Sequence, residues 1–597
     1  MNQQLKLTAA ATASIPRRVM VLLTLIYAFV GLFGRDPWKN DDAEGFGVMW
    51  TLAHGSWSDW LLPHLAGRDE LVGAPLPYWI GALMIKLFGG ILGETSAARL
   101  IVAICFIATA ATIWYATYLL GRRAEVQPMK FAFGGQPSSK EYGKTLADGA
   151  LLIFLACVGL AIRVHETSPM MLELLGLSFL LYGTVRGLDK PLQGGFLAGI
   201  GLVVLSLSGM LWATVFLGLG SSAALLVYQS KTQLRWLLTA AITLLIGLSI
   251  WPMMWYSSHL TTEVIHHTNY IWWGRDQLLG HPSLESFKFF SMNFWFYAWP
   301  VWPLSGLSIY YWSYSGLKGW RAAHLAIPTC IFIAELLFLL FIQELSERFL
   351  IILVPPMAIL AAFALPFLKR SIISFIDWLA LISFTILAGF IWIIWLAKMT
   401  GFPRATANNL ARYLPGFVAH FSWSELIIAL IITALWVLVI RWRTSRAPQV
   451  IWRCVVISAA GTTLMWGLLM TLWLPTINYA KTYRHVANRF ALAVPAGSKC
   501  IDTTALGDAQ LASFIYFTKL NLQDNPACDL RITHTAHDAH ESAIENQQNL
   551  QLIWEDRRAS DRDEKLRLYR VTKKSSSESS ATNPVNITVA QPTPASH

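Results

Sequence analysis

The chain has 597 residues, of which 55% are hydrophobic and only 14% are charged. Its mean hydropathy of +0.47 exceeds what a soluble protein of this length needs to bury a core, so a soluble enzyme is excluded. Six cysteines are too few for a disulfide scaffold. The net charge of +11 does not imply a nucleic-acid partner, because basic residues in an apolar chain also set its orientation in a membrane.

Fourteen apolar segments follow one another along the chain and predict an all-α polytopic membrane protein in the lipid bilayer. The segment 75–92 is short and interrupted by Pro and Gly, so we expect it to lie on the membrane surface, which leaves thirteen spans. The segments lie near residues 19–34, 75–92, 97–120, 147–162, 169–185, 192–208, 211–228, 236–257, 294–316, 322–343, 349–368, 372–397, 424–440 and 454–473.

The loop cations set the expected orientation. With thirteen spans, most of them fall on the side of the N-terminus, and the positive-inside rule then places that side in the cytoplasm. We therefore expect a bacterial inner-membrane protein with a cytoplasmic N-terminus at 1–18, a transmembrane domain at 19–473 that includes a first periplasmic loop at 35–96, a small periplasmic α/β domain at 474–573, and a disordered tail at 574–597.

Two cysteines, Cys500 and Cys528, fall in the expected outer domain. In an oxidising periplasm they would be able to pair, and free thiols are the alternative.

The first outer loop opens with three carboxylates, Asp41, Asp42 and Glu44. At the membrane surface, a partly desolvated carboxylate acts as a general base or binds a hard cation. The alternative is an acidic first helical turn, in which Asp41 or Asp42 caps the helix expected at 45–53.

The order of motifs along the chain resembles the GT-C superfamily of membrane glycosyltransferases. The nearest branch is the lipid A aminoarabinose transferase and its relatives, with the protein O-mannosyltransferases further away. The motifs are the acidic pair, GxW followed by LLPHLxG at 55–67, PLPYW at 75–79, FGG at 88–90, AARL at 97–100, Glu166, Arg275, His281-Pro282, Asn293, the Pro300–Pro303 turn, Ser346–Phe349 and Pro355-Pro356.

This resemblance implies an inverting transfer of a sugar from a polyprenyl (undecaprenyl) phosphate donor to a lipid, polysaccharide or protein acceptor on the periplasmic face. By position, Asp41 matches the catalytic aspartate of the family and Asp42 the acidic residue after it. Glu44 stands where relatives often carry an Arg, and Val72–Pro75 replaces their Glu-Lys-Pro-Pro motif. These departures from the family pattern put a metal role and the identity of the donor in doubt. A divalent cation stays an open alternative, and its ligands and the donor's sugar stay open.

The resemblance also implies roles for residues outside the acidic pair. Glu166 joins the pair as a catalytic residue, with an ion pair to Arg163 as the alternative. Fixed cations are needed where a phosphate leaving group gains charge, although interfacial arginines also serve as membrane anchors. The expected substrate-binding residues are Glu44, His165, Arg275, His281 and Arg348.

Other polar residues leave further alternatives open. Glu263, His266 and His267 have helical spacing that permits a metal site, and Glu335 lies mid-span, where it serves function or helix packing. A flippase or transporter also has many spans, but it usually places its ionisable residues near the midplane. A non-catalytic scaffold would not need the acidic pair.

Overall fold

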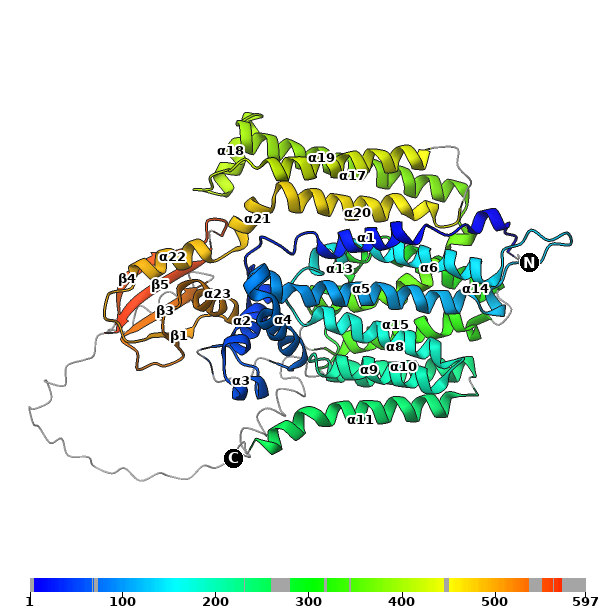
Figure 1. Cartoon of the computed structure of the whole chain (residues 1–597), viewed down its shortest axis with the longest axis horizontal. Helices are drawn as coiled ribbons and strands as arrows, with labels where there is room; N and C mark the ends of the chain where they lie inside the picture. Colours follow the sequence, from blue (N-terminus) through cyan, green and yellow to red (C-terminus); the bar gives the residue numbers. More distant parts are fainter. Residues whose placement is uncertain are drawn as a thin grey trace, which may run out of the picture.

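The computed structural model describes residues 5–66, 68, 73–229, 231–258, 280–315, 319–342, 345–444, 450–535, 550–561 and 563–571. The long helices run side by side and form a bundle, with a small sheet at one end (Figure 1). Within these ranges nine helices are long and apolar enough to cross a membrane, which makes the chain a multi-pass membrane protein. They are α1 (Arg17–Phe29, preceded by η1, Ala9–Thr12), α5 (Glu94–Gly121), α8 (Met170–Gly187), α10 (Leu211–Tyr228), α11 (Gln233–Ser257), α15 (Ala323–Phe341), α17 (Arg370–Thr400), α19 (Trp423–Thr444) and α20 (Arg453–Leu472).

The other four expected spans are short or broken helices. Proline lacks an N–H and clashes with the preceding turn, and Pro300 lies where one of these segments divides. The elements are α6 (Ser139–Leu155) with α7 (Val158–Arg163), α9 (Pro191–Ser206), α13 (Leu284–Tyr297) with α14 (Val301–Ser315), and η5 (Glu347–Leu353) with α16 (Val354–Ala362) and η6 (Leu365–Phe367).

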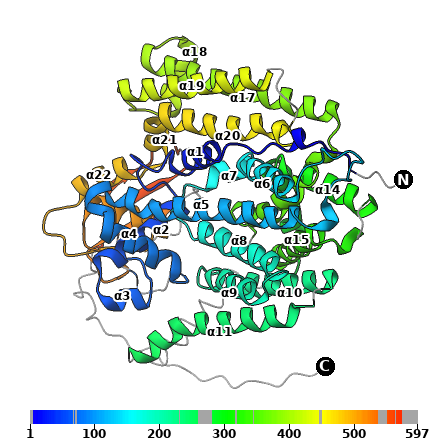
Figure 2. The same ribbon diagram turned by 45° about the vertical axis from the view of Figure 1, so that its right-hand side comes forward.

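The first loop forms three helices, α2 (Asp41–His54), α3 (Trp57–Leu61) and α4 (Leu76–Leu92). Helix α4 lies across one end of the bundle beside α2, as expected for a surface helix rather than a span (Figures 1 and 2). We call this end, which also meets the sheet, the domain end. The N-terminal part of the chain lies at the opposite end (Figure 1).

The C-terminal part is a mixed five-stranded sheet with strand order β2-β1-β3-β5-β4. β1 is parallel to β2 and β3, and β5 is antiparallel to β3 and β4. Cys500 and Cys528 form a disulfide, which confirms the pairing that the sequence left open. The elements are α21 (Leu474–Lys481), α22 (Arg484–Ala493), β1 (Ile501–Ala505), α23 (Asp508–Thr518), β2 (Leu522–Gln523), β3 (Leu530–Thr535), β4 (Leu550–Asp556) and β5 (Lys565–Val571). The remaining short helices are η2 (Ala124–Val126), η4 (Gly319–Arg321) and α18 (Arg404–Tyr413).

The first loop and the sheet domain share one hydrophobic core. Phe46 and Met49 of α2 belong to the same buried cluster as Leu511 and Phe514 of α23. A Cβ on Gly47 would stand 2.4 Å from the Cβ of Ala512, so α2 and α23 approach too closely for a larger residue at that position. This packing fixes the acidic end of α2 against the C-terminal domain.

Candidate active site at the domain end

Asp42 is the centre of a buried hydrogen-bond network at the start of α2. Its Oδ2 accepts hydrogen bonds from the guanidinium groups of Arg35 and Arg99 and from the backbone N–H of Trp38, each at 3.0 Å. Its Oδ1 accepts from the N–H and the hydroxyl of Thr167, both at 2.8 Å. The side chain is 1% exposed. Asp42 therefore ties the first loop to the segment 163–169, which connects α7 to α8 and which we call the second outer loop after its expected orientation.

The electrostatics of this network favour an ionised Asp42. Burial alone would raise the pKa of its carboxyl, but the charges of Arg35 and Arg99 and the backbone donors hold that pKa well below its usual range. Burial also lowers the pKa of the Arg35 guanidinium to about 10, against the opposing effect of Asp42. A carboxylate held this strongly in its charged form is a poor proton acceptor near neutral pH.

Asp41, one residue earlier, has a different environment. It is partly exposed in the first turn of α2, and no hydrogen bond or ion pair joins its carboxylate to another residue in the described part of the chain. Its charge acts on Glu166 and Arg163 of the second outer loop and on Tyr78 of α4. Asp41 is therefore within electrostatic range of both groups, and its carboxylate is available.

The second outer loop supplies one side of the site. Arg163 lies 3.3 Å from Glu166 and 3.1 Å from Glu347, so the ion pair considered for Glu166 is present. Burial raises the pKa of the Glu166 carboxyl, against the lowering effect of Arg163, and the charges of Asp42 and Asp41 add to the rise.

The other side of the site is formed around the Tyr78 hydroxyl. Burial raises the pKa of Tyr78, and the charged side chains that act on it are Glu44, Arg348, Glu173 and Asp41. The Arg348 guanidinium lies 4.6 Å from the centre of the Phe349 ring. Within the described ranges, Arg348 has no ion pair. Its charge therefore lies within electrostatic range of the carboxylates around Tyr78 without a direct ion pair to any of them in these ranges.

The C-terminal domain holds the entry to α2 in place. The buried Asp36 accepts hydrogen bonds from the Thr482 hydroxyl at 3.0 Å and from Nε of Arg484 at 2.9 Å. The amide oxygen of Asn478 accepts from the N–H of Asp36 and from the indole of Trp38, both at 3.0 Å. These contacts immobilise the segment between α1 and Asp41.

The remaining expected site residues are placed unevenly. His165 is buried, its Nε2 lies 2.8 Å from the carbonyl of Tyr27, and burial lowers its pKa to about 4, so it is a neutral packing residue in this structure. His281 is exposed just before α13. Arg275 and the cluster at 263–267 lie outside the described residues. Glu335 is buried in α15.

No group of three or more His, Cys, Asp or Glu residues that would hold a metal ion occurs in the ranges the structure describes. The divalent cation stays a prediction.

Sequence reasoning missed several members of the site. Arg35 is one of the loop cations, Arg99 is part of the AARL motif and Tyr78 is part of the PLPYW segment, and none of these patterns assigns the residue to the site. Glu173 had a usable signal, because it is an acidic residue near the start of an apolar span, which is costly without a partner. The same rule applies to Glu335 in α15.

Comparison with known proteins gives structural likeness only. No family model and no curated protein matches the sequence. Two crystal structures of ArnT from Cupriavidus metallidurans are similar in fold: the apo state, with a TM-score of 0.63, and the state bound to undecaprenyl phosphate, with a TM-score of 0.61. Each is 15% identical to this chain, and the alignment covers 93% of this chain and 97% of the other. The chain therefore has the fold of ArnT over nearly its whole length.

Proposed function

We propose that this protein is an inverting glycosyltransferase that moves a sugar from a polyprenyl phosphate to an acceptor at the domain end of the membrane. The single observation that carries the proposal is the environment of Asp41. Its carboxylate is partly exposed and has no partner among the described residues, it acts on Tyr78 as Arg348 also does, and the network of Asp42 holds the start of α2 in place. The likeness to ArnT supports the donor class, since one of those structures holds undecaprenyl phosphate.

In this mechanism Asp41 takes the proton from the acceptor hydroxyl or amine. The acceptor atom then attacks the anomeric carbon, and the bond from that carbon to the phosphate oxygen breaks. Polyprenyl phosphate leaves with the bonding electron pair, and Arg348 stabilises its growing negative charge. Attack from the side opposite the leaving group inverts the anomeric centre.

The other carboxylates have supporting roles in this proposal. Asp42 acts as a positioning residue, because its oxygens are already engaged by Arg35, Arg99 and Thr167. Glu166 sits beside Arg163 within electrostatic range of Asp41 and orients the acceptor. Glu44 and Glu173 lie around Tyr78 and shape the donor side.

The proposal includes an orientation in the membrane. We place the domain end in the periplasm, because the Cys500–Cys528 disulfide fits an oxidising compartment and the basic loops fall at the opposite end.

The test measures sugar transfer by the purified full-length protein in proteoliposomes. The vesicles contain polyprenyl-phosphate sugars and envelope glycolipids taken from a membrane lipid extract. Mass spectrometry should show loss of the donor together with the appearance of polyprenyl phosphate and of an acceptor heavier by one sugar. Movement of intact donor between leaflets with no change of mass would instead support the flippase alternative.

A further inference from the structure

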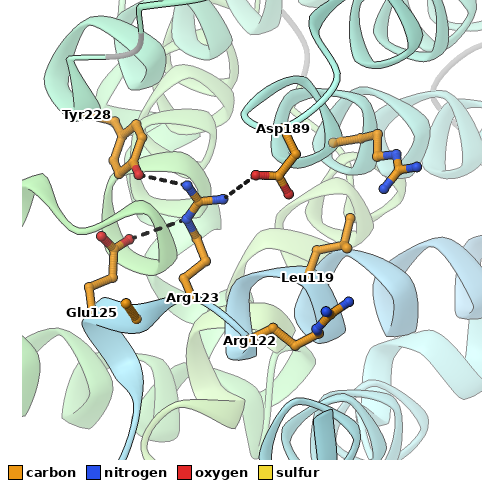
Figure 3. Close-up of a pocket in the computed structure, with 8 residues that line it drawn as sticks. Leu119, Arg122, Arg123, Glu125, Asp189 and Tyr228 are labelled. Atoms are coloured by element: carbon orange, nitrogen blue, oxygen red, sulfur yellow. Dashed lines mark hydrogen bonds and ion pairs between the residues drawn. The ribbon is translucent and has the colours of Figure 1, made fainter. Parts of the chain in front are cut away.

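A second polar site lies at the end of the bundle opposite the candidate active site. The C-terminal ends of α5, α8 and α10 surround a pocket of about 570 Å³ (Figure 3). Along helix α5, about 30 Å separates Arg99 at the candidate active site from Leu119 in the pocket. The pocket is lined by Leu119, Arg122, Arg123, Ala124, Glu125, Arg186, Asp189 and Tyr228.

Arg123 is held in the wall of this pocket by a complete set of partners. It donates a hydrogen bond to the Tyr228 hydroxyl at 2.8 Å, and it lies 3.3 Å from Asp189 and 3.8 Å from Glu125. Figure 3 shows these three side chains converging on the one guanidinium. Both carboxylates that line the pocket are thus engaged by Arg123.

Arg122 and Arg186 keep their charge uncompensated. Neither has an ion pair with any residue in the described ranges. Arg122 lies 5.2 Å from the centre of the Tyr118 ring, and its guanidinium points away from Arg123 (Figure 3). Arg186 makes a long hydrogen bond of 3.5 Å to the side chain of Gln193. One side of the pocket is therefore neutralised, and the other presents two guanidinium groups.

The two guanidinium groups favour an anionic ligand, and the position of the pocket at the helix ends favours a lipid as the molecule that carries it. Guanidinium groups bind phosphate oxygens in bidentate geometry. The pocket lies where the apolar helices α5, α8 and α10 end, which is the level at which a membrane protein meets lipid headgroups, and Leu119 gives it an apolar wall. We propose that this pocket binds the phosphate of an anionic glycerophospholipid from the leaflet opposite the domain end, with Arg122 and Arg186 as its ligands and Arg123 as a positioning residue.

The test measures lipid binding to the purified full-length protein in detergent, with dioctanoyl phosphatidylglycerol as the probe. Dioctanoyl phosphatidylcholine and inorganic phosphate serve as comparison ligands. Replacing both arginines, Arg122→Gln with Arg186→Gln, should weaken phosphatidylglycerol binding about 30-fold, and each single change about fivefold. Arg235→Gln removes an exposed cation at the same end of the bundle but outside the pocket, and it should leave binding unchanged.

Any of the following outcomes would overturn the proposal. The first is that the double variant binds phosphatidylglycerol as tightly as the unmodified protein does. The second is that Arg235→Gln weakens binding as much as the double change does. The third is that phosphatidylcholine binds as tightly as phosphatidylglycerol. Equal affinity for inorganic phosphate would overturn the lipid as source. A lower melting temperature with unchanged lipid affinity in the single variants would mean that these arginines only offset the negative ends of α5 and α8. Sugar transfer is not part of this readout.

Discussion

Asp41 and Asp42 are neighbours in the first turn of α2, but only Asp42 is buried. Asp42→Asn would leave the guanidiniums of Arg35 and Arg99 without a counter-charge in the interior. Removing one partner of a buried ion pair costs about 3–5 kcal/mol, so the melting temperature of the purified protein should fall by several degrees.

Asp41→Asn is the matched control, because it makes the same substitution at the neighbouring residue. It breaks no contact with a described residue and should leave the melting temperature within about a degree. Equal melting temperatures for the two variants would contradict the roles assigned here.

The acidic pair was predicted from the sequence, but the division of roles between its two members was not. That division depends on Arg35, Arg99 and Thr167, which come from three different segments. Their meeting at Asp42 is a property of helix packing, and local pattern carries no signal for it. Glu173 was predictable from its position in an apolar span.

At the scale of elements, α2 depends on a close approach to the second outer loop. A Cβ on Gly45 would stand 1.9 Å from the carbonyl oxygen of Thr167. Gly45→Ala should therefore push α2 away from that loop, lower stability by about 1–3 kcal/mol and reduce sugar transfer. Thermal unfolding and transfer assays check both effects.

The control for Gly45→Ala is Gly90→Ala in α4, where nothing lies within 4 Å of the added methyl group. Alanine favours a helix there, so stability should stay equal or rise slightly. A similar loss in both variants would show that the close contact at Gly45 is not the cause.

The sheet domain contains a pH-sensitive contact. Burial alone would raise the pKa of Glu564, but its hydrogen bonds with His534 and Tyr483 and the charge of Arg558 lower it to about 2. The stabilisation by this carboxylate is therefore complete above the unfolded pKa of 4.5 and is lost as the pH falls toward 2. It is of the order of 3 kcal/mol.

Glu564→Gln should make the domain less stable at pH 7 and remove most of its acid sensitivity between about pH 4.5 and 2. Hydrogen exchange of peptides from β3 and β5 in the full chain measures this. Glu555→Gln, whose side chain is 45% exposed beside Arg567, is the control and should change little. An unaltered pH dependence in Glu564→Gln would contradict the assignment.

Element prediction from the sequence succeeded where apolar runs are long and uninterrupted. The nine long helices coincide with expected spans, and 75–92 is a crosswise helix. It was less accurate at 147–162, 294–316 and 349–368, where hydropathy continues through breaks in the helix. Hydropathy measures partition into lipid, and it is insensitive to a local interruption that neighbouring helices bury.

At the scale of the whole molecule, the C-terminal domain and the first loop form one unit. Replacing both Cys500 and Cys528 with Ala should destabilise the domain by about 2–4 kcal/mol, because the unfolded chain is no longer constrained. Sugar transfer should fall with it, since Phe46 of α2 packs in the same core. Cys330→Ala, which removes a free thiol in α15, is the control. Full transfer with a destabilised domain would contradict the coupling.

The central claim is that Asp41 is the base in sugar transfer. Its most direct test is a single-turnover assay by mass spectrometry, with donor bound in advance and acceptor then added, for Asp41→Asn and for Glu285→Gln. Glu285 is an exposed carboxylate in the first turn of α13 and serves as the matched control. We predict that Asp41→Asn binds the donor but transfers its sugar at least about 100-fold more slowly, while Glu285→Gln transfers at the full rate. Unchanged transfer by Asp41→Asn would contradict the claim.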